Sequence, residues 1–319
     1  MTELSIRYFS EDDSIEWDSF IELSHKGTFL HSRKFLSYHG DRFVDRSLIV
    51  EDRNKIVAVL PACQTYDNKS AVVSHLGATY GGLITSASCY GEDLISVMHA
   101  ICVFYRNEGF SELCYKVTPS VYHNTIDEDE IYALFRLNAE LVRVDNNAVV
   151  DKYSRLKVSN QRKRSFKKAR DANLTLFSGF ENLEDFYSVL LSNLSEKHNA
   201  KPVHTISELR ELKFRFNKEI ELVVAKNEVG YVISGVVFFN INNVVHSQYI
   251  ASSSEGYDKG GLDFIFEKKI DDLLENQQRF LAFGTSNESN GKVLNQSLYR
   301  FKRQFGAGSV AHQYYSIKL

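Results

Sequence analysis

The residues with the clearest capacity for chemistry lie in the last quarter of the sequence, from Val244 onward. An apolar segment at 244–252, rich in β-branched and aromatic residues, predicts a strand, and a polar loop with three glycines follows at 253–261. Apolar residues at helical spacing from Leu262 predict a helix after the loop. Backbone N–H groups and the positive end of a helix dipole converge at such a junction. The segment therefore predicts either an anion-binding loop or a plain strand-to-helix turn.

Several common catalytic motifs are missing from the chain. The glycine loop has neither the G-x-x-x-x-G-K-[ST] pattern of a phosphate-binding loop nor the G-x-G-x-x-G pattern of a dinucleotide site. There is no H-E-x-x-H, and the four cysteines (Cys63, Cys89, Cys102 and Cys114) are not spaced for zinc. A G-x-S-x-G nucleophile elbow is also absent. We therefore expect no metal and no serine acyl-enzyme.

Two side chains of this last quarter are candidates for proton transfer. His246 lies in the predicted strand at 244–252, and Glu288 ends the polar loop that follows a second predicted strand at 279–284. Either side chain can act as a general base, whereas the alternatives are a structural histidine and a solvated glutamate. Lys302 lies in a helix-like stretch beside an apolar stripe, and taken alone it predicts a surface lysine.

The elements that must position these residues occur in a pattern that is repeated along the chain. Three strands, a glycine loop, a helix and a further strand occur in each half, offset by roughly 170 residues, although the residues themselves are not alike. His75 and His246 hold comparable places in the third strand of each half. We therefore expect two domains of similar topology, at 1–150 and 151–319. The predicted segments are strands at 47–51, 56–65, 71–76 and 112–117 with a loop at 77–82 and a helix at 92–106, then strands at 220–225, 232–241, 244–252 and 280–283.

One segment breaks the charge balance of the chain. Nine basic residues and no acid lie between Lys152 and Arg170, and Ser159 can cap a helix that begins there. A solvated helix face is the simplest interpretation of such a run. A phosphate contact is about equally well supported, because arginine forms bidentate bonds to phosphate oxygens. A nucleic-acid arm is the third alternative.

Bulk properties narrow the class of protein. The chain has 319 residues, a formal net charge of −3 and a pI near 6.4, which give no global drive toward nucleic acid or anionic membranes. No apolar run approaches the length of a membrane span, and the first residues do not have the pattern of a signal peptide. We expect a cytoplasmic protein with small-molecule substrates, no nucleic-acid partner and no membrane span, and we leave a homo-oligomer open.

Several stretches taken together resemble the FemAB-like acyltransferases of the GNAT superfamily. The basic segment at 161–169 resembles the helix that opens their second domain, and the run at 283–288, with Asn295 and 301–306, resembles their C-terminal signature. More narrowly, 74–82 and 283–288 are similar to GNAT transferases of bacterial polysaccharide clusters. The transferases that acylate dTDP-3-amino-3,6-dideoxyhexoses are the nearest match, and the resemblance covers nearly the whole chain from Trp17 onward.

The resemblance implies an α/β fold of two tandem GNAT-like domains, each a mixed sheet flanked by helices, with an active-site cleft between them. It implies an N-acyltransferase that moves an acyl group of acetyl or 3-hydroxybutyryl type from acyl-CoA to the amine of a nucleotide-linked amino sugar, by direct attack, for O-antigen or capsule synthesis. The N-terminal domain would then bind the acceptor. The C-terminal domain would bind acyl-CoA and carry the catalytic signature.

The resemblance also implies a set of site residues. One departure is that the loop at 252–261 lacks the R/Q-x-x-G-x-G/A string with which many GNAT enzymes hold the CoA diphosphate. The expected catalytic residues are Glu288, His246 and Lys302; the expected coenzyme A contacts are Ser253, Gly260, Gly261, Asn287 and Asn295; and the expected acceptor contacts are His75, Tyr80, Gly81, Gly82, Arg162, Arg164 and Tyr249.

Two other functions remain open from the sequence. A FemAB-type enzyme would transfer an aminoacyl group from tRNA to a peptidoglycan precursor, but it would need a helical hairpin, and no long coiled-coil stretch is present. A non-catalytic module of GNAT type, or an RNA-binding protein that uses the basic run at 152–170, belongs to a different functional class.

Overall fold

The computed structural model describes residues 4–198, 202–273, 275 and 277–319. The chain forms two compact units. Unit 1 comprises Met1–Asp145, Ser289–Lys292 and Ala311–Leu319, and unit 2 comprises Asn146–Glu288 and Val293–Val310. The main segment of unit 1 thus ends at Asp145, five residues before the expected boundary at 150. Unit 1 also includes the last residues of the chain, because the strand β16 (Gly308–Lys318) pairs with β7 (Glu112–Lys116).

Unit 1 contains two sheets, ordered β1-β2-β3-β6 and β4-β5-β7-β16. The predicted strand at 56–65 is divided into β3 and β4 at Pro61, because proline has no N–H to donate to a neighbouring strand. The strands of unit 1 besides β7 and β16 are β1 (Leu4–Tyr8), β2 (Leu48–Asp52), β3 (Lys55–Leu60), β4 (Cys63–Gln64), β5 (Ala71–Val73) and β6 (Ile84–Thr85). Its helices are α1 (Ser14–Leu23), α2 (Arg33–Leu36), α3 (Gly91–Asn107) and α4 (Asp129–Arg136), with short 3-10 turns η1 (Glu11–Asp13), η2 (Phe29–His31), η3 (Ser37–Arg42) and η4 (Ser120–Tyr122).

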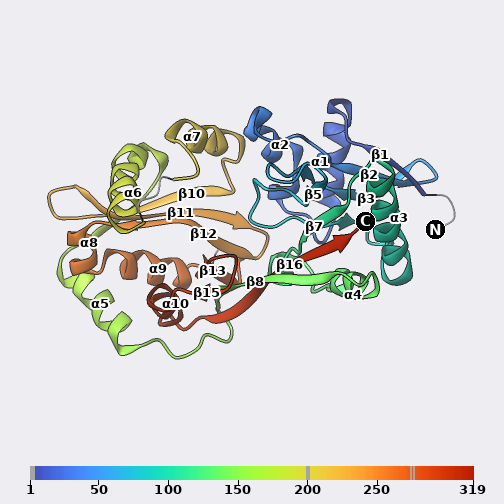
Figure 1. The fold of residues 1–319 in the computed structure, drawn as a ribbon. Coiled ribbons are helices and arrows are strands. Elements are labelled where there is room, and N and C mark those ends of the chain that lie inside the picture. The colour runs from blue at the N-terminus through green and yellow to red at the C-terminus, as the bar shows by residue number, and fades with distance from the viewer. Residues whose placement is uncertain (1–3, 199–201, 274, 276) are drawn as a thin grey trace. The chain divides into compact units, whose positions relative to one another are not determined.

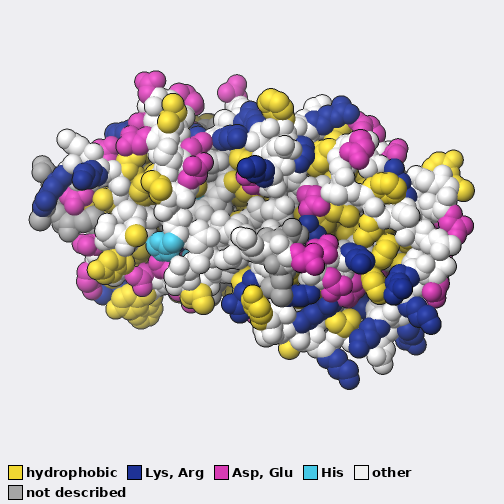
Figure 2. Space-filling view, turned by 180° about the vertical axis from the view of Figure 1, so that it is seen from behind, with side chains coloured by type: hydrophobic (Ala, Val, Ile, Leu, Met, Phe, Trp, Pro, Cys, Tyr) yellow, Lys and Arg dark blue, Asp and Glu magenta, His cyan; other side chains and the backbone are white. Residues whose placement is uncertain are grey.

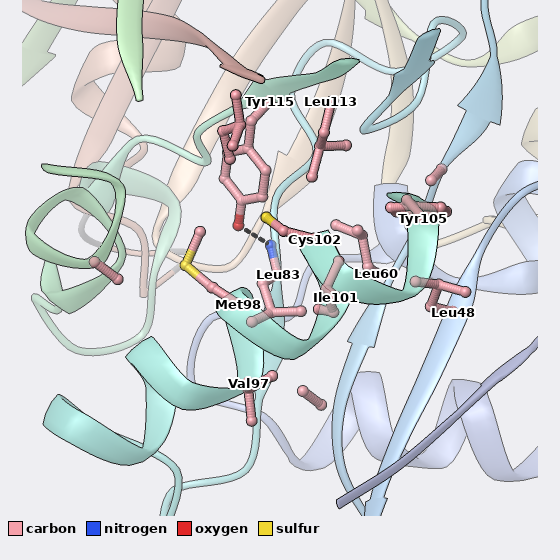
Figure 3. Close-up of a cluster of buried hydrophobic side chains, with 14 of the residues drawn as sticks. Leu48, Leu60, Leu83, Val97, Met98, Ile101, Cys102, Tyr105, Leu113 and Tyr115 are labelled. Carbon is pink, nitrogen blue, oxygen red and sulfur yellow. Dashed lines mark hydrogen bonds between the residues drawn. The ribbon is translucent and has the colours of Figure 1, made fainter. Parts of the chain in front are cut away.

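The main core of unit 1 forms around α3, whose apolar residues recur at helical spacing and are buried on one face. Ile101 and Tyr105 of this helix lie beside Leu60 and Leu48 of the sheet, and Met98 belongs to the same cluster near Leu83 (Figure 3). The buried Tyr115 hydroxyl group has a hydrogen-bond partner in this core, since its oxygen accepts from the Leu83 N–H over 2.6 Å (Figure 3). Burial of these side chains is the dominant stabilising contribution to such a unit.

Unit 2 is built on a sheet of order β8-β13-β12-β11-β10-β9, with helices on both faces (Figure 1). Its strands are β8 (Glu140–Asp151), which begins in unit 1, β9 (Thr175–Ser178), β10 (Ile220–Lys226), β11 (Val232–Ile241), β12 (Val244–Ser252), β13 (Phe280–Thr285), β14 (Asn287–Glu288) and β15 (Val293–Leu294). Its helices are α5 (Asn160–Asp171), α6 (Leu183–His198), α7 (Ile206–Arg215), α8 (Ser254–Lys259), α9 (Gly261–Asp271) and α10 (Gln296–Arg303), with the turn η5 (Phe180–Asn182).

The two faces of this sheet are covered by different helices. Leu262, Ile265 and Phe266 of α9 join the core with Val245 and Phe283 on one face. The helix α6 lies on the other face (Figure 1). The predicted glycine loop at 253–261 differs from expectation, since most of it is the short helix α8, which Ser253 caps by accepting a hydrogen bond from the Gly256 N–H.

Candidate functional site

The parallel strands β12 and β13 stay together for only three residue pairs, from Val244↔Phe280 to His246↔Ala282. Both strands are irregular at the point where they part. On β12, Val237 of β11 pairs with Tyr249 and Phe238 with Ser247, so that Gln248 is an extra residue. On β13, the register against β8 shifts between Ala282 and Thr285. Such bulges bend a strand and re-aim its side chains, and they are common beside active sites.

Gly284 has the backbone conformation that the bulge on β13 requires. Its φ is +76°, a region that glycine adopts without steric cost and that other residues rarely occupy. A Cβ atom at this position would lie 3.7 Å from the Ser247 carbonyl oxygen and 3.9 Å from Cε1 of His246. Gly284 therefore turns β13 directly beside His246 and Ser247. We use the name strand-split site for the residues around this turn: His246, Ser247, Gly284, Thr285, Ser286 and Lys302.

Lys302 is buried in this site and is not the surface lysine that its position in the sequence indicates. Its side chain reaches from α10 to β13, where Nζ donates to the carbonyl oxygens of Gly284 over 3.0 Å and Thr285 over 2.7 Å. Only 3% of the residue is exposed, and this burial lowers the pKa of its amine to about 7. A protonated lysine has three N–H donors, so one remains for a ligand.

Two buried hydroxyl groups of the strand-split site lack a hydrogen-bond partner among the described residues. They are Oγ of Ser247, which is 5% exposed, and Oγ of Ser286, which is 2% exposed. Leaving a buried polar group unpaired costs about 1–3 kcal/mol. Most buried polar groups in proteins are paired, so these two hydroxyl groups are candidates for contact with water or a ligand.

Ser247, Ser286 and Gly284 were not among the site residues expected from the sequence, although Gly284 and Ser286 lie within the signature run at 283–288. Serine is common in strands and loops, so the sequence contains no signal for the unpaired hydroxyl groups. The Phe283-Gly284 pair at the end of a predicted strand was a usable signal for the bulge, because glycine within a strand often marks one.

The remaining signature residues form the loop that follows β13. Glu288 is exposed on β14, and its carboxylate accepts a hydrogen bond from Asn295 Nδ2 over 2.9 Å. Asn295 also caps α10 by accepting from the Leu298 N–H, and Asn287 Oδ1 accepts from the Asn146 N–H over 2.6 Å. These bonds give Asn287 and Asn295 a clear structural role in the loop. Their expected contact with coenzyme A stays a prediction.

Tyr249 lies on β12 beyond the bulge and is tied to another part of unit 2. Its hydroxyl group lies 2.6 Å from Nδ1 of His204 and accepts a hydrogen bond from the His204 N–H over 3.1 Å. Burial raises the pKa of this phenol to about 12. At neutral pH Tyr249 is therefore a hydrogen-bonding group and not a base.

The residues expected to hold a CoA diphosphate pack against the protein itself. A Cβ atom on Gly261 would lie 2.4 Å from Oγ of Ser234, and one on Gly260 would lie 2.4 Å from the Ser165 carbonyl oxygen. The Gly260 N–H donates to the carbonyl oxygens of Gly256 and Tyr257. Close packing therefore explains why both positions are glycine. Their expected contact with coenzyme A, through backbone amides, stays a prediction.

A cavity of about 530 Å³ lies beside this loop, at the end of β12. Ser253, which was expected to contact coenzyme A, is part of its wall. The lining contains no lysine or arginine, and its one charged residue is Glu255, which pairs with Lys259 over 2.9 Å. The lining residues are Ser188, Val189, Ser192, Asn193, Ser252, Ser253, Ser254, Glu255 and Tyr257. Most of the lining residues thus carry hydroxyl or amide groups, and none of them offers a positively charged side chain to a phosphate.

The four residues of unit 1 expected to contact the acceptor are buried. His75 accepts a hydrogen bond from the Gly77 N–H over 3.2 Å, and burial lowers its pKa to about 3. The Tyr80 ring lies 4.8 Å from that of Tyr122, centroid to centroid. Gly81 and Gly82 have no room for a side chain, since a Cβ atom would lie 2.0 Å from the Ser74 carbonyl oxygen and 2.6 Å from Glu130 Oε1, respectively. None of the four offers an exposed side chain to an acceptor.

The two arginines expected to bind the acceptor differ from each other. Arg162 is buried and forms an ion pair of 3.0 Å with Asp263, while its guanidinium lies 4.9 Å from the centre of the Phe301 ring. Burial raises the pKa of Asp263 to about 7, against the opposing effect of Arg162. Arg162 therefore joins α5 to α9, whereas Arg164 is exposed on α5. The expected contact of both arginines with the acceptor stays a prediction.

Two further properties concern the part of the chain that the structure describes. Within it, no group of three or more His, Cys, Asp or Glu side chains is arranged to hold a metal ion. None of its helices combines the length and the apolar character that crossing a membrane requires.

Comparisons with known proteins show likeness in structure and not in sequence. No family model matches the sequence, and a search of curated proteins finds no match either. Among solved structures, FemX is similar with a TM-score of 0.69 at 12% identity, covering 99% of this chain and 97% of FemX. L-PGS from Bacillus licheniformis is similar with a TM-score of 0.62 at 12% identity, over 96% and 92% of the two chains.

A tandem GNAT protein from the clavulanic acid biosynthesis pathway is also similar, with a TM-score of 0.51 at 10% identity over 99% of this chain and 98% of that protein. Likeness at such low identity establishes a shared fold and nothing finer. The expectation of a mixed α/β fold is confirmed, and the chain has the tandem GNAT-like fold over nearly its whole length.

Proposed function

We propose that this chain is an acyltransferase, and that the strand-split site of unit 2 is where an acyl group passes to an amine. The observation that carries the proposal is the buried Lys302, which keeps one N–H free beside two parted strands. The unpaired hydroxyl groups of Ser247 and Ser286 add two further polar groups near the same backbone turn. The tandem GNAT-like fold supports this class of reaction by analogy of fold.

Acyl transfer to an amine needs a base, donors for an oxyanion and an acid for the leaving group. The amine nitrogen attacks the acyl carbonyl carbon, a C–N bond forms, and the bond from that carbon to the sulfur or oxygen of the carrier breaks. The amine gives up a proton to a base, for which His246 and Glu288 are the candidates. Lys302, with a pKa of about 7, can donate a hydrogen bond to the oxyanion and give a proton to the departing carrier near neutral pH.

The substrates we propose are those that the sequence resemblance implies. The acceptor is a nucleotide-linked amino sugar of the dTDP-3-amino-3,6-dideoxyhexose type, and the donor is an acyl-CoA with an acetyl or 3-hydroxybutyryl group. Such a reaction belongs to a cytoplasmic step of O-antigen or capsule synthesis. The proposal assigns only the acyl end of the donor to residues of the strand-split site, and the contacts of its diphosphate stay a prediction.

A second candidate is aminoacyl transfer from tRNA to a peptidoglycan precursor, the FemAB-type reaction. The likeness to FemX favours it, since the TM-score of 0.69 is higher than the 0.51 found for the tandem GNAT protein. Both candidates use the same chemistry at the amine, and they differ in the carrier of the acyl group and in the acceptor.

The test pairs each donor with each acceptor and detects the product by mass spectrometry. The donors are acetyl-CoA, 3-hydroxybutyryl-CoA and an aminoacyl-tRNA, and the acceptors are dTDP- and UDP-linked amino sugars and a peptidoglycan precursor. We expect an N-acylated sugar nucleotide and an equal amount of free CoA thiol. Product from the aminoacyl-tRNA alone would replace the first candidate with the second, and no product from any pair would refute both.

Variants then test the site itself. Loss of one preorganised oxyanion donor typically lowers turnover about 10²–10³-fold, so Lys302→Met should show a loss of this size. Lys268→Met, at an exposed lysine of α9, is the matched control and should keep the wild-type rate. His246→Gln and Glu288→Gln compare the two candidate bases; wild-type rates for both would remove them from the mechanism.

A further inference from the structure

The basic segment at 152–170 contains two kinds of charge that the sequence alone does not distinguish. Three of its nine basic residues form ion pairs within unit 2. Lys152 lies 3.6 Å from Asp271, Arg155 lies 2.7 Å from Glu267, and Arg162 lies 3.0 Å from Asp263. All three acids belong to α9, so these pairs fasten the segment to that helix.

The other six basic residues are exposed and make no ion pair with the described residues. Five of them lie on α5, and at 100° per residue they cover one arc of about 160°, opposite the buried Ala169. The only acid of α5 is its last residue, Asp171. Figure 2 shows Lys and Arg side chains gathered at the lower right, over α5. We call this set the basic face: Lys157, Lys163, Arg164, Lys167, Lys168 and Arg170.

Within the helix, these charges work against stability. Lys163 and Lys167, and likewise Arg164 and Lys168, are spaced four residues apart, and like charges at that spacing repel each other. A basic face without compensating acids is electrostatically complementary to a surface that carries many negative charges.

The residue types of the basic face favour a lipid surface over a nucleic acid. Four of the six are lysines, whose compact charge on a flexible stem suits mobile head groups, whereas the fixed phosphates of a nucleic acid are better matched by bidentate arginine. On α5 itself the one aromatic ring, Phe166, is only partly exposed and lies 5.8 Å from the Phe264 ring, centroid to centroid, so the helix offers no open ring on which a base could stack.

Two apolar side chains precede the helix and point to the same conclusion. Tyr153 is 71% exposed and Leu156 is 51% exposed, and Lys157 follows directly. Tyrosine is enriched where lipid head groups meet the hydrocarbon, and interfacial segments combine apolar residues with lysine and arginine. We propose that the basic face, with Tyr153 and Leu156, docks this protein on an anionic membrane surface. This goes beyond the proposed acyl transfer and does not depend on it.

The test measures sedimentation of the full chain with large vesicles of phosphatidylcholine alone or mixed equally with phosphatidylglycerol. We expect binding to the anionic vesicles only, and weaker binding as salt is added. A basic residue near such a surface contributes roughly fivefold to binding, so K163Q/K167Q/R170Q should bind about 100-fold more weakly. Y153S/L156S should also weaken binding. Thermal unfolding shows whether the variants fold as the wild type does.

The matched control is K55Q/K69Q/R106Q, which removes the same charge from exposed residues of unit 1 and should bind within about twofold of wild type. Three results would overturn the proposal: equal binding to neutral vesicles, no binding to anionic vesicles at low salt, or equal weakening by the control. A parallel titration with a fluorescent RNA duplex covers the other polyanion. If K163Q/K167Q/R170Q loses RNA binding while vesicle binding is unchanged, the basic face is a nucleic-acid surface instead.

Discussion

Replacing Lys302 with methionine should change how the stability of this protein depends on pH. Burial lowers the pKa of Lys302 from 10.5 to about 7. Below about pH 7 the amine is protonated in both the folded and unfolded states, and the folded state bears the full cost of the buried charge. Between about pH 7 and 10.5 the folded state loses the proton while the unfolded state keeps it. The free energy of unfolding therefore rises with pH over this window.

The size of the effect follows from the pKa difference. At 1.36 kcal/mol per pH unit, the whole window is worth about 5 kcal/mol. In the accessible range from about pH 7 to 9, the wild type should gain about 2 kcal/mol relative to Lys302→Met, because the amine is already half deprotonated in the folded state at pH 7. Other shifted groups, such as Lys116 with its pKa of about 8, are present in both proteins and cancel in the difference.

Urea denaturation of both proteins at several pH values from about 6 to 9 measures this difference. Lys268→Met is again the control, and its difference from wild type should stay within about 0.5 kcal/mol at every pH because Lys268 is exposed. A wild-type minus Lys302→Met difference that does not vary with pH would refute the reasoning. It would mean that burial does not lower the pKa of Lys302, which could then not act as an acid near pH 7.

Three further predictions concern the same unit. Gly284→Ala should lower the free energy of unfolding by about 1–2 kcal/mol in chemical denaturation, because φ is +76°, and it should also lower the acyl-transfer rate. The control is Gly230→Ala, at a φ of +90° in the β10–β11 turn, which should cost as much stability and leave the rate unchanged. Ser286→Ala should stabilise the fold by about 0.5–1 kcal/mol, since it removes an unpaired hydroxyl group, yet slow the transfer; a loss of stability would show that the hydroxyl is paired. Arg162→Met should lower the free energy of unfolding by about 3–5 kcal/mol, because it leaves Asp263 buried and unpaired. The double variant R162M/D263L should recover most of this stability in thermal unfolding, and equal losses in both variants would contradict the prediction.

Much of the architecture could be predicted because it depends on local pattern. The strand at 244–252 corresponds to β12 without change of bounds, and the helix predicted at 92–106 is α3 within one residue at each end. Both segments are long and strongly patterned, so the identity of their neighbours matters little. The strand at 56–65 was wrong at Pro61, where the missing N–H outweighs the favourable composition on either side.

The site was harder to predict because its properties arise from burial. Lys302 has the neighbours of a surface lysine in sequence, and only the fold places its amine against two carbonyl oxygens of β13. Glycines raise the same difficulty: Gly81 and Gly261 make room for the protein itself, which a sequence cannot distinguish from room for a ligand. The sequence also could not show which residues of the basic run form ion pairs and which are exposed. The acids that pair with three of them lie about a hundred residues away on α9.

The way in which β16 is shared has a practical consequence for dissecting this protein. Ile317, near the end of that strand, lies in the same core as Leu113, and the strand pairs with β7 through Tyr314↔Lys116 to Lys318↔Glu112. A fragment cut at residue 150 would leave the edge of β7 without its partner and a hole in its hydrophobic interior, which favours aggregation. Residues 311–319 would have to be supplied as a separate peptide, or joined to the first half by circular permutation, before unit 1 could be studied by itself.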